Sequence, residues 1–307
     1  MSRTFAFVQV DVFTDQIFGG NQLAVFFDLE PGALSAAEMQ AIALEMNLAE
    51  TTFVYPPTRA DCVAQVRIFT PGRELPFAGH PTVGTTWVLA NRGRLPARQR
   101  EVSLEEGIGP VPVRLEGDLS APTMVWMSHR DAEFGEPLPN RAAFAEALHL
   151  AEADLLPDQP VRTGSTGIPF LYVPLRTPEA VDRAEPDMRA ISSAFTGERV
   201  GVFVFAPDPD RGAARVYARM FAGDTIGVAE DSATGSASGP LAAFVAERGI
   251  VQTAPSGEIE IVSLQGNQMG RPSLIHMSAQ LLDGRATHIE VGGGVVPVFE
   301  GVLTLPS

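Results

Sequence analysis

The stretch FAGHPTVG at residues 77–84 decides the fold, together with EDSATGSA at residues 230–237. Each stretch is a small loop that contains glycine and a side chain able to accept or donate a proton. Each leads into an apolar run that ends at Arg-Gly. We interpret the pair as two halves of one active site.

The two halves of the chain repeat one another. Gly79, Ala90 and Gly93 of the first run are followed, at one constant separation, by Gly235, Ala246 and Gly249. Upstream, residues 67–69 (RIF) correspond to residues 219–221 (RMF) at a separation four residues shorter, so the second loop is four residues longer. A repeat of this length is far longer than the period of a solenoid, so it predicts two similar domains that face each other.

The secondary structure predicted from local signals is α+β. Proline in the first turn and glycine at the C-terminal cap predict a helix over residues 81–92, and the repeat predicts a second over 236–248. Apolar residues surround most of the first helix, as expected for a helix enclosed by sheet. Many short strands accompany each helix. We predict an N-terminal domain of residues 1–120, completed by a last strand at about 295–307, and a C-terminal domain of residues 121–294.

Composition limits the classes of partner. The 307-residue chain has 37 acidic and 22 basic residues and a formal charge of -15, which makes a nucleic-acid backbone or an anionic membrane surface an unfavourable partner. Cys62 is the only cysteine, so no intrachain disulfide and no cysteine-based metal site can form. We find neither a signal-peptide pattern nor an apolar run long enough to span a membrane, and expect a cytoplasmic protein.

Glu50 is the first candidate for a catalytic group. A capping box at residues 35–38 predicts a helix that ends near Asn47, and a β-branched strand follows, so Glu50 lies at the transition. A carboxylate held against apolar surface there would have a raised pKa, as a general base requires. The alternative is an ordinary exposed glutamate, which is how we interpret Glu45.

His80 stands at the mouth of the first predicted helix, where its ring could exchange a proton or a hydrogen bond with a substrate near neutral pH. A structural hydrogen-bonding role is the alternative. The other histidines, His129, His149, His276 and His288, show no metal-ligand spacing, so we predict no metal site.

Asp231 precedes a small-residue loop that enters the second helix. Backbone N–H groups at such a helix N-terminus suit a substrate carboxylate. Asp231 and Ser236 could instead be plain helix caps. The loop is not a Walker motif, because no Gly-Lys-Ser/Thr follows it.

Three motifs together resemble the phenazine-biosynthesis (PhzF-like) isomerase family. They are NLAETTF at residues 47–53, AGHPT at 78–82 and EDSATGSA at 230–237, and residues 11–13, 20–25 and 166–170 also look like that family. The resemblance implies a diaminopimelate epimerase-like fold, in which each domain wraps a sheet as a barrel around a central helix and the active site lies in the interdomain cleft. It also suggests a homodimer.

The resemblance implies a cofactor-independent isomerisation of a small carboxylated molecule such as trans-2,3-dihydro-3-hydroxyanthranilate. In that reaction a glutamate takes a proton from carbon 3 and a proton is returned at carbon 1. By motif match the base is Glu50, and His80 and Asp231 are the other catalytic residues. The implied substrate-binding residues are Gly79, Thr234, Gly235 and Ser236. Ser232 departs from the family, which usually has proline there.

The same residues were also compared with three other functions. Epimerases of this fold use one cysteine from each half, at positions that are Ala78 and Thr234 here, so that two-base chemistry is not available. A non-catalytic small-molecule binding or regulatory protein that keeps the cleft is the main alternative. A hydrolase that uses Ser236 with His80 and Asp231 is weaker, because Ser236 lacks a nucleophile elbow.

Overall fold

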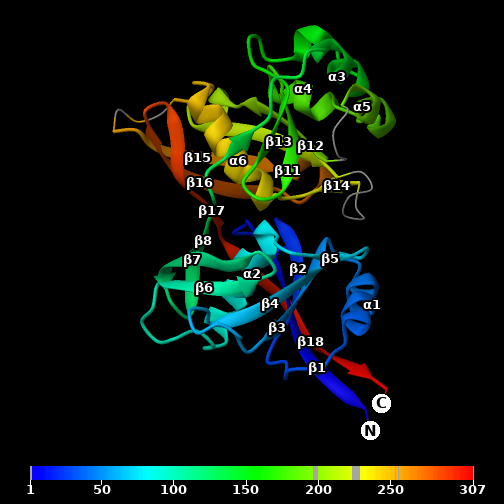
Figure 1. Cartoon of the computed structure of the whole chain (residues 1–307), viewed down its shortest axis with the longest axis vertical. Coiled ribbons are helices and arrows are strands. Elements are labelled where there is room, and N and C mark those ends of the chain that lie inside the picture. The colour runs from blue at the N-terminus through cyan, green and yellow to red at the C-terminus, as the bar shows by residue number, and fades with distance from the viewer. Residues whose placement is uncertain (1, 196–199, 223–228, 253, 255, 307) are drawn as a thin grey trace. The chain divides into compact units, whose positions relative to one another are not determined.

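The computed structural model describes residues 2–195, 200–222, 229–252, 254 and 256–306. The chain forms two compact units, residues 1–128 with 292–307 (unit 1) and residues 129–291 (unit 2) (Figure 1). The predicted ranges divided the chain earlier, at residue 120. That position is the turn between two paired strands, β7 (Gly109–Asp118) and β8 (Ala121–Ser128), so the structure keeps β8 in unit 1.

Unit 1 is a curled sheet around one helix. In chain order its elements are β1 (Arg3–Val12), β2 (Asn21–Phe26), α1 (Ala36–Met46), β3 (Glu50–Tyr55), β4 (Ala64–Phe69), β5 (Glu74–Leu75), α2 (Gly79–Asn91), β6 (Glu101–Glu106), β7 (Gly109–Asp118), β8 (Ala121–Ser128) and β18 (Val295–Leu305). Strand pairing gives the order β18-β1-β2-β3-β4-β6-β7-β8, with β5 added on β4. The pairs β2–β3 and β4–β6 are parallel, and the others are antiparallel.

Helix α2 lies inside this sheet. Every residue from Gly79 to Ala90 is buried. The helix contacts β1, β2 and β18 near one end of the strand order and β8 at the other end, so the sheet wraps around it. The enclosed helix predicted from its apolar circumference is therefore confirmed, with a start two residues before Pro81.

Helix α1 covers the outer face of the sheet in unit 1. Ser35 and Glu38 form the predicted capping box, and Met39, Ile42 and Ala43 are buried. These residues pack with Phe26, Phe53 and Phe69 in one hydrophobic cluster. The cluster fixes α1 against the strands, and with it the direction in which the chain enters β3.

Unit 2 repeats the plan. Its elements are β9 (Glu133–Phe134), α3 (Arg141–Ala147), η1 (Glu152–Asp154), β10 (Arg162–Ser165), β11 (Pro169–Pro174), α4 (Pro178–Arg183), α5 (Met188–Ala194), β12 (Gly201–Pro207), η2 (Pro209–Arg211), β13 (Arg215–Phe221), β14 (Glu230–Asp231), α6 (Gly235–Glu247), β15 (Glu258–Gln265), η3 (Asn267–Met269), β16 (Ser273–Leu282) and β17 (Arg285–Gly293). Helix α6 is buried from Gly235 to Ala246 and contacts β10, β15 and β16.

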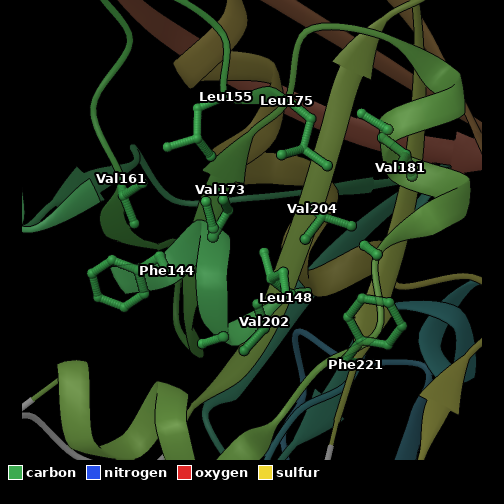
Figure 2. Close-up of a cluster of buried hydrophobic side chains, with 14 of the residues drawn as sticks. Phe144, Leu148, Leu155, Val161, Val173, Leu175, Val181, Val202, Val204 and Phe221 are labelled. Carbon is green, nitrogen blue, oxygen red and sulfur yellow. The ribbon is translucent and has the colours of Figure 1, made fainter. Parts of the chain in front are cut away.

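Three helices, α3, α4 and α5, form an outer layer on unit 2 (Figure 1). Phe144 of α3, Leu148 at its C-terminal cap and Val181 of α4 pack against Val202 and Val204 of β12 in one buried cluster (Figure 2). Helix α4 was missing from the sequence prediction, although Thr177 caps it and Pro178 occupies its first turn.

The strand topology confirms the internal repeat. In unit 2, β11–β12 and β13–β15 are parallel, as β2–β3 and β4–β6 are in unit 1. The pairs β12–β13 and β15–β16 are antiparallel, as β3–β4 and β6–β7 are in unit 1. Short strands β5 and β14 each precede the central helix and pair with β4 and β13. The equivalence defines counterparts, residue by residue, in the two units.

Candidate functional site

Glu50 is the first residue of β3, where the chain leaves α1. Asn47 ends α1 in the left-handed conformation, at φ 51°, and this turns the chain toward the sheet. Strand β3 lies between β2 and β4, and the Glu50 side chain is only 8% exposed. The structure therefore places a buried carboxyl group at the predicted helix-to-strand transition.

His80 of α2 faces this carboxyl group. Its Nε2 lies 3.3 Å from Glu50 Oε2, and its Nδ1 lies 3.2 Å from Nδ2 of Asn21. Burial lowers the pKa of His80 to about 3, opposed by a hydrogen bond with the Gln22 backbone. Because the ring is neutral at physiological pH, the contact with Glu50 is between an imidazole and a carboxyl group and is not an ion pair.

The turn before β2 puts Asn21 beside His80. Gly20 has φ 62°, and a Cβ atom there would lie 2.3 Å from the carbonyl oxygen of Val12, so only glycine fits. Asn21 then begins β2 with its side chain buried. Sequence reasoning included Asn21 in a motif but gave it no role, because its contact with His80 spans 59 residues.

Asp231 and Thr234 form the corresponding region of unit 2. Thr234 Oγ1 donates to Asp231 Oδ2 at 2.7 Å, and both residues are buried. Gln265, at the end of β15, donates from Nε2 to the Asp231 carbonyl at 2.8 Å and accepts from the Thr234 N–H at 3.2 Å. Gln265 thus fixes the loop, although nothing in its sequence context distinguished it.

Neither Asp231 nor Ser236 caps α6. The N-cap residue is Thr234, and its side chain makes no capping hydrogen bond. Gly235 and Ser236 are the first two helical residues, as Gly79 and His80 are in α2. The capping alternative for Asp231 and Ser236 is therefore wrong. Both helices begin without a side-chain cap at the N-cap residue, which is compatible with an anion bound to the first turn.

The counterparts of the site residues differ between the units. Glu50 begins β3 beside Leu23, whereas its counterpart Gly201 begins β12 beside Phe170. His80 corresponds to Ser236, and Ala78 and Thr234 are the equivalent N-cap residues. The units therefore carry different chemical groups on the same framework.

The described residues match neither the pattern of a metal site nor that of a membrane-spanning helix. In the part of the chain that the structure describes, no three His, Cys, Asp or Glu residues are grouped as metal ligands would be. Among the same residues, no helix is both long enough and apolar enough to cross a membrane.

A family model described as phenazine biosynthesis-like protein (PhzC-PhzF) matches residues 10–301. The chain belongs to this family. It is 36% identical to a trans-2,3-dihydro-3-hydroxyanthranilate isomerase of Pseudomonas chlororaphis, over 97% of this chain and 99% of that protein. An uncharacterised isomerase of Mesorhizobium japonicum is 34% identical, over 98% of this chain and 99% of that protein.

Solved structures agree with the family assignment. A PhzF-family protein of Bacillus anthracis superposes with a TM-score of 0.86 at 25% identity, and the match covers 98% of this chain and 99% of that one. A hydroxyproline epimerase of Agrobacterium vitis superposes with a TM-score of 0.65 at 14% identity, covering 99% and 93%. The mixed α+β fold predicted from the sequence, shared by PhzF proteins and this group of epimerases, is therefore confirmed.

Proposed function

We propose that the protein is a cofactor-independent isomerase in which Glu50 moves a proton within a small carboxylated substrate. The observation that carries the proposal is the buried pair of Glu50 and neutral His80, 3.3 Å apart. A carboxylate in such surroundings is less solvated than in water and accepts a carbon-bound proton more readily. His80 orients the carboxyl group.

For trans-2,3-dihydro-3-hydroxyanthranilate, the substrate named for the Pseudomonas relative, the steps balance without a co-reactant. Glu50 takes the proton from carbon 3, the electron pair shifts the double bond, and the protonated Glu50 returns a proton at carbon 1. The family resemblance implies that Asp231 binds a polar group of the substrate, and the N–H groups in the first turn of α6 suit a carboxylate.

A single base favours isomerisation over racemisation. The equivalent N-cap residues Ala78 and Thr234 carry no thiol, and the counterpart of Glu50 is Gly201. One carboxylate can move a proton along one face of a molecule, whereas inversion at carbon needs an acid and a base on opposite faces.

The hydrolase alternative is disfavoured by the surroundings of His80. A triad histidine directs one ring nitrogen to the nucleophile and the other to a carboxylate. Here Nδ1 faces Asn21 and Nε2 faces Glu50, so neither nitrogen is directed at a serine.

The test is proton NMR of trans-2,3-dihydro-3-hydroxyanthranilate with the protein in D₂O. We expect conversion with deuterium in the product, and a loss of at least ~10²-fold in kcat for Glu50→Gln, the usual lower limit for a general base. Glu45→Gln is the matched control, because Glu45 lies exposed on α1. Binding of the substrate without conversion by the wild type would support the alternative of a small-molecule binding protein. Normal turnover by Glu50→Gln would remove Glu50 from the mechanism.

A further inference from the structure

Glu106 is a buried carboxyl group that the proposed reaction does not use. It is the last residue of β6 and is 5% exposed. Its Oε1 lies 2.6 Å from Thr82 Oγ1 in the first turn of α2. Among the described residues its Oε2 has no hydrogen-bond partner. A charged carboxylate in this position would leave most of its charge uncompensated.

A count of protons shows which form Glu106 takes. Thr82 Oγ1 is also 2.7 Å from the carbonyl oxygen of Ala78, which can only accept. The Thr82 hydroxyl has one proton, so it can donate to Ala78 or to Glu106 but not to both. Both contacts are hydrogen bonds at once only if Glu106 is protonated and donates to Thr82.

The internal repeat gives independent support, because the counterpart of Glu106 is an amide. Glu106 and Gln265 each end the strand that follows the central helix. In the parallel pair β4–β6, Gln65 pairs with Glu105, and Glu106 is the next residue. In the parallel pair β13–β15, Tyr217, which is equivalent to Gln65, pairs with Leu264, and Gln265 is the next residue. Gln265 donates to Thr234 Oγ1 at 3.0 Å, so a neutral donor holds the start of α6.

Neighbouring charges are paired elsewhere. Arg67 of β4 and Glu74 of β5 form a two-pronged ion pair with N–O distances of 2.7 Å. Glu105 accepts hydrogen bonds from Thr58 and Arg59. Helix α2 has no charged side chain, and its one titratable residue is the neutral His80. With burial as the dominant cause and the bond to Thr82 opposing it, the pKa of Glu106 is raised to about 8.

We propose that Glu106 is a positioning residue for the active site, a neutral acid that donates to Thr82 and thereby holds the first turn of α2. That turn carries His80, whose Nε2 faces Glu50. The role in turnover rests on the proposed function, but the protonation and the effect on the turn do not. Deprotonation removes the donor, so the geometry of the Ala78–Thr82 turn is lost on the alkaline side.

The experiment is an NMR titration of the full chain labelled with ¹³C at glutamate carboxyl groups and with ¹⁵N. The resonance that disappears in Glu106→Gln is Glu106. We expect it to remain protonated at pH 7, and the amide signals of residues 78–82 to shift when it titrates. In Glu106→Gln the amide donates in its place, so these signals should stay near their neutral-pH positions at every pH. Glu106→Leu, which removes the donor, should move them at every pH.

Turnover separates this proposal from the proposed function. If the wild type isomerises the substrate, its kcat/KM should fall on the alkaline side as Glu106 titrates, and Glu106→Gln should lose that part of the pH dependence. If the wild type shows no turnover, the proposed function fails while the titration still tests Glu106. A Glu106 carboxyl that titrates near 4.5, or turn signals that ignore its titration, would overturn the proposal.

Discussion

Replacing Gly84 with alanine tests how closely the sheet of unit 1 encloses α2. A Cβ atom at Gly84 would lie 2.7 Å from Leu23 Cδ2 and 2.7 Å from Val12 Cγ2, both closer than van der Waals contact allows. Leu23 and Val12 are completely buried in β2 and β1, and a valine side chain has little rotamer freedom. The new methyl group can be accommodated only if the strands or the helix shift.

Two effects of opposite sign decide the magnitude. Alanine in a helix interior is more favourable than glycine by about 1 kcal/mol. Overpacking a close-packed core costs about 1–3 kcal/mol, and two simultaneous contacts favour the upper part of that range. We therefore expect Gly84→Ala to lower the free energy of unfolding of unit 1 by about 1–2 kcal/mol.

Tryptophan fluorescence during urea unfolding follows the change through reporters that lie in unit 1. The two tryptophans of the chain, Trp87 in α2 and Trp126 in β8, both belong to unit 1. Gly72→Ala is the control, because the nearest atom to a Cβ there is Thr70 Oγ1 at 3.9 Å. An unchanged or higher midpoint for Gly84→Ala would mean that the sheet does not enclose α2 this tightly.

Two further predictions concern buried charge. Because the folded protein keeps a proton on Glu106 up to about pH 8 that the unfolded chain releases near 4.5, wild-type stability should fall as pH rises between these values, by at most about 5 kcal/mol. Glu106→Gln should remove this slope, measured by fluorescence-detected urea unfolding across that range. Arg219→Gln should lower the free energy of unfolding by about 3 kcal/mol, because Arg219 is 12% exposed, pairs with Glu230 and donates to three carbonyl oxygens. The same substitution at its more exposed counterpart Arg67 should lower it by about 1 kcal/mol. Thermal unfolding followed by circular dichroism compares the two variants, and equal losses would contradict the role of burial.

Features set by neighbouring residues could be predicted from the sequence. The capping box at Ser35 fixes the start of α1, and the proline and glycine at the ends of α2 limit that helix to within two residues. Glu50 comes shortly after the end of α1, so its position at the start of β3 could also be predicted from the sequence. Each of these depends on backbone conformations that a few adjacent side chains determine.

Contacts between distant residues could not be predicted. Asn21 reaches His80, Glu106 reaches Thr82 and Gln265 reaches Asp231 only after the strands have paired in one register. A shift of that register by one residue would turn each side chain to the other face of its strand. The sequence indicated Glu50, His80 and Asp231 as candidate acid and base groups, but the contacts that these residues make depend on the pairing of the whole sheet.

The internal repeat fits the proposed reaction, which uses a single base. Both units place the first turn of a buried helix beside the end of the strand that follows it, and a neutral donor, Glu106 or Gln265, contacts a hydroxyl group at that turn. The reactive positions diverge on this common support: unit 1 has Glu50 and His80 where unit 2 has Gly201 and Ser236. Two equivalent bases would favour exchange between opposite faces of a carbon atom, whereas one base returns the proton to the face from which it came. The common framework therefore accounts for the fold shared with epimerases, and the unequal side chains suit the proposed proton shift between two carbons better than inversion at one.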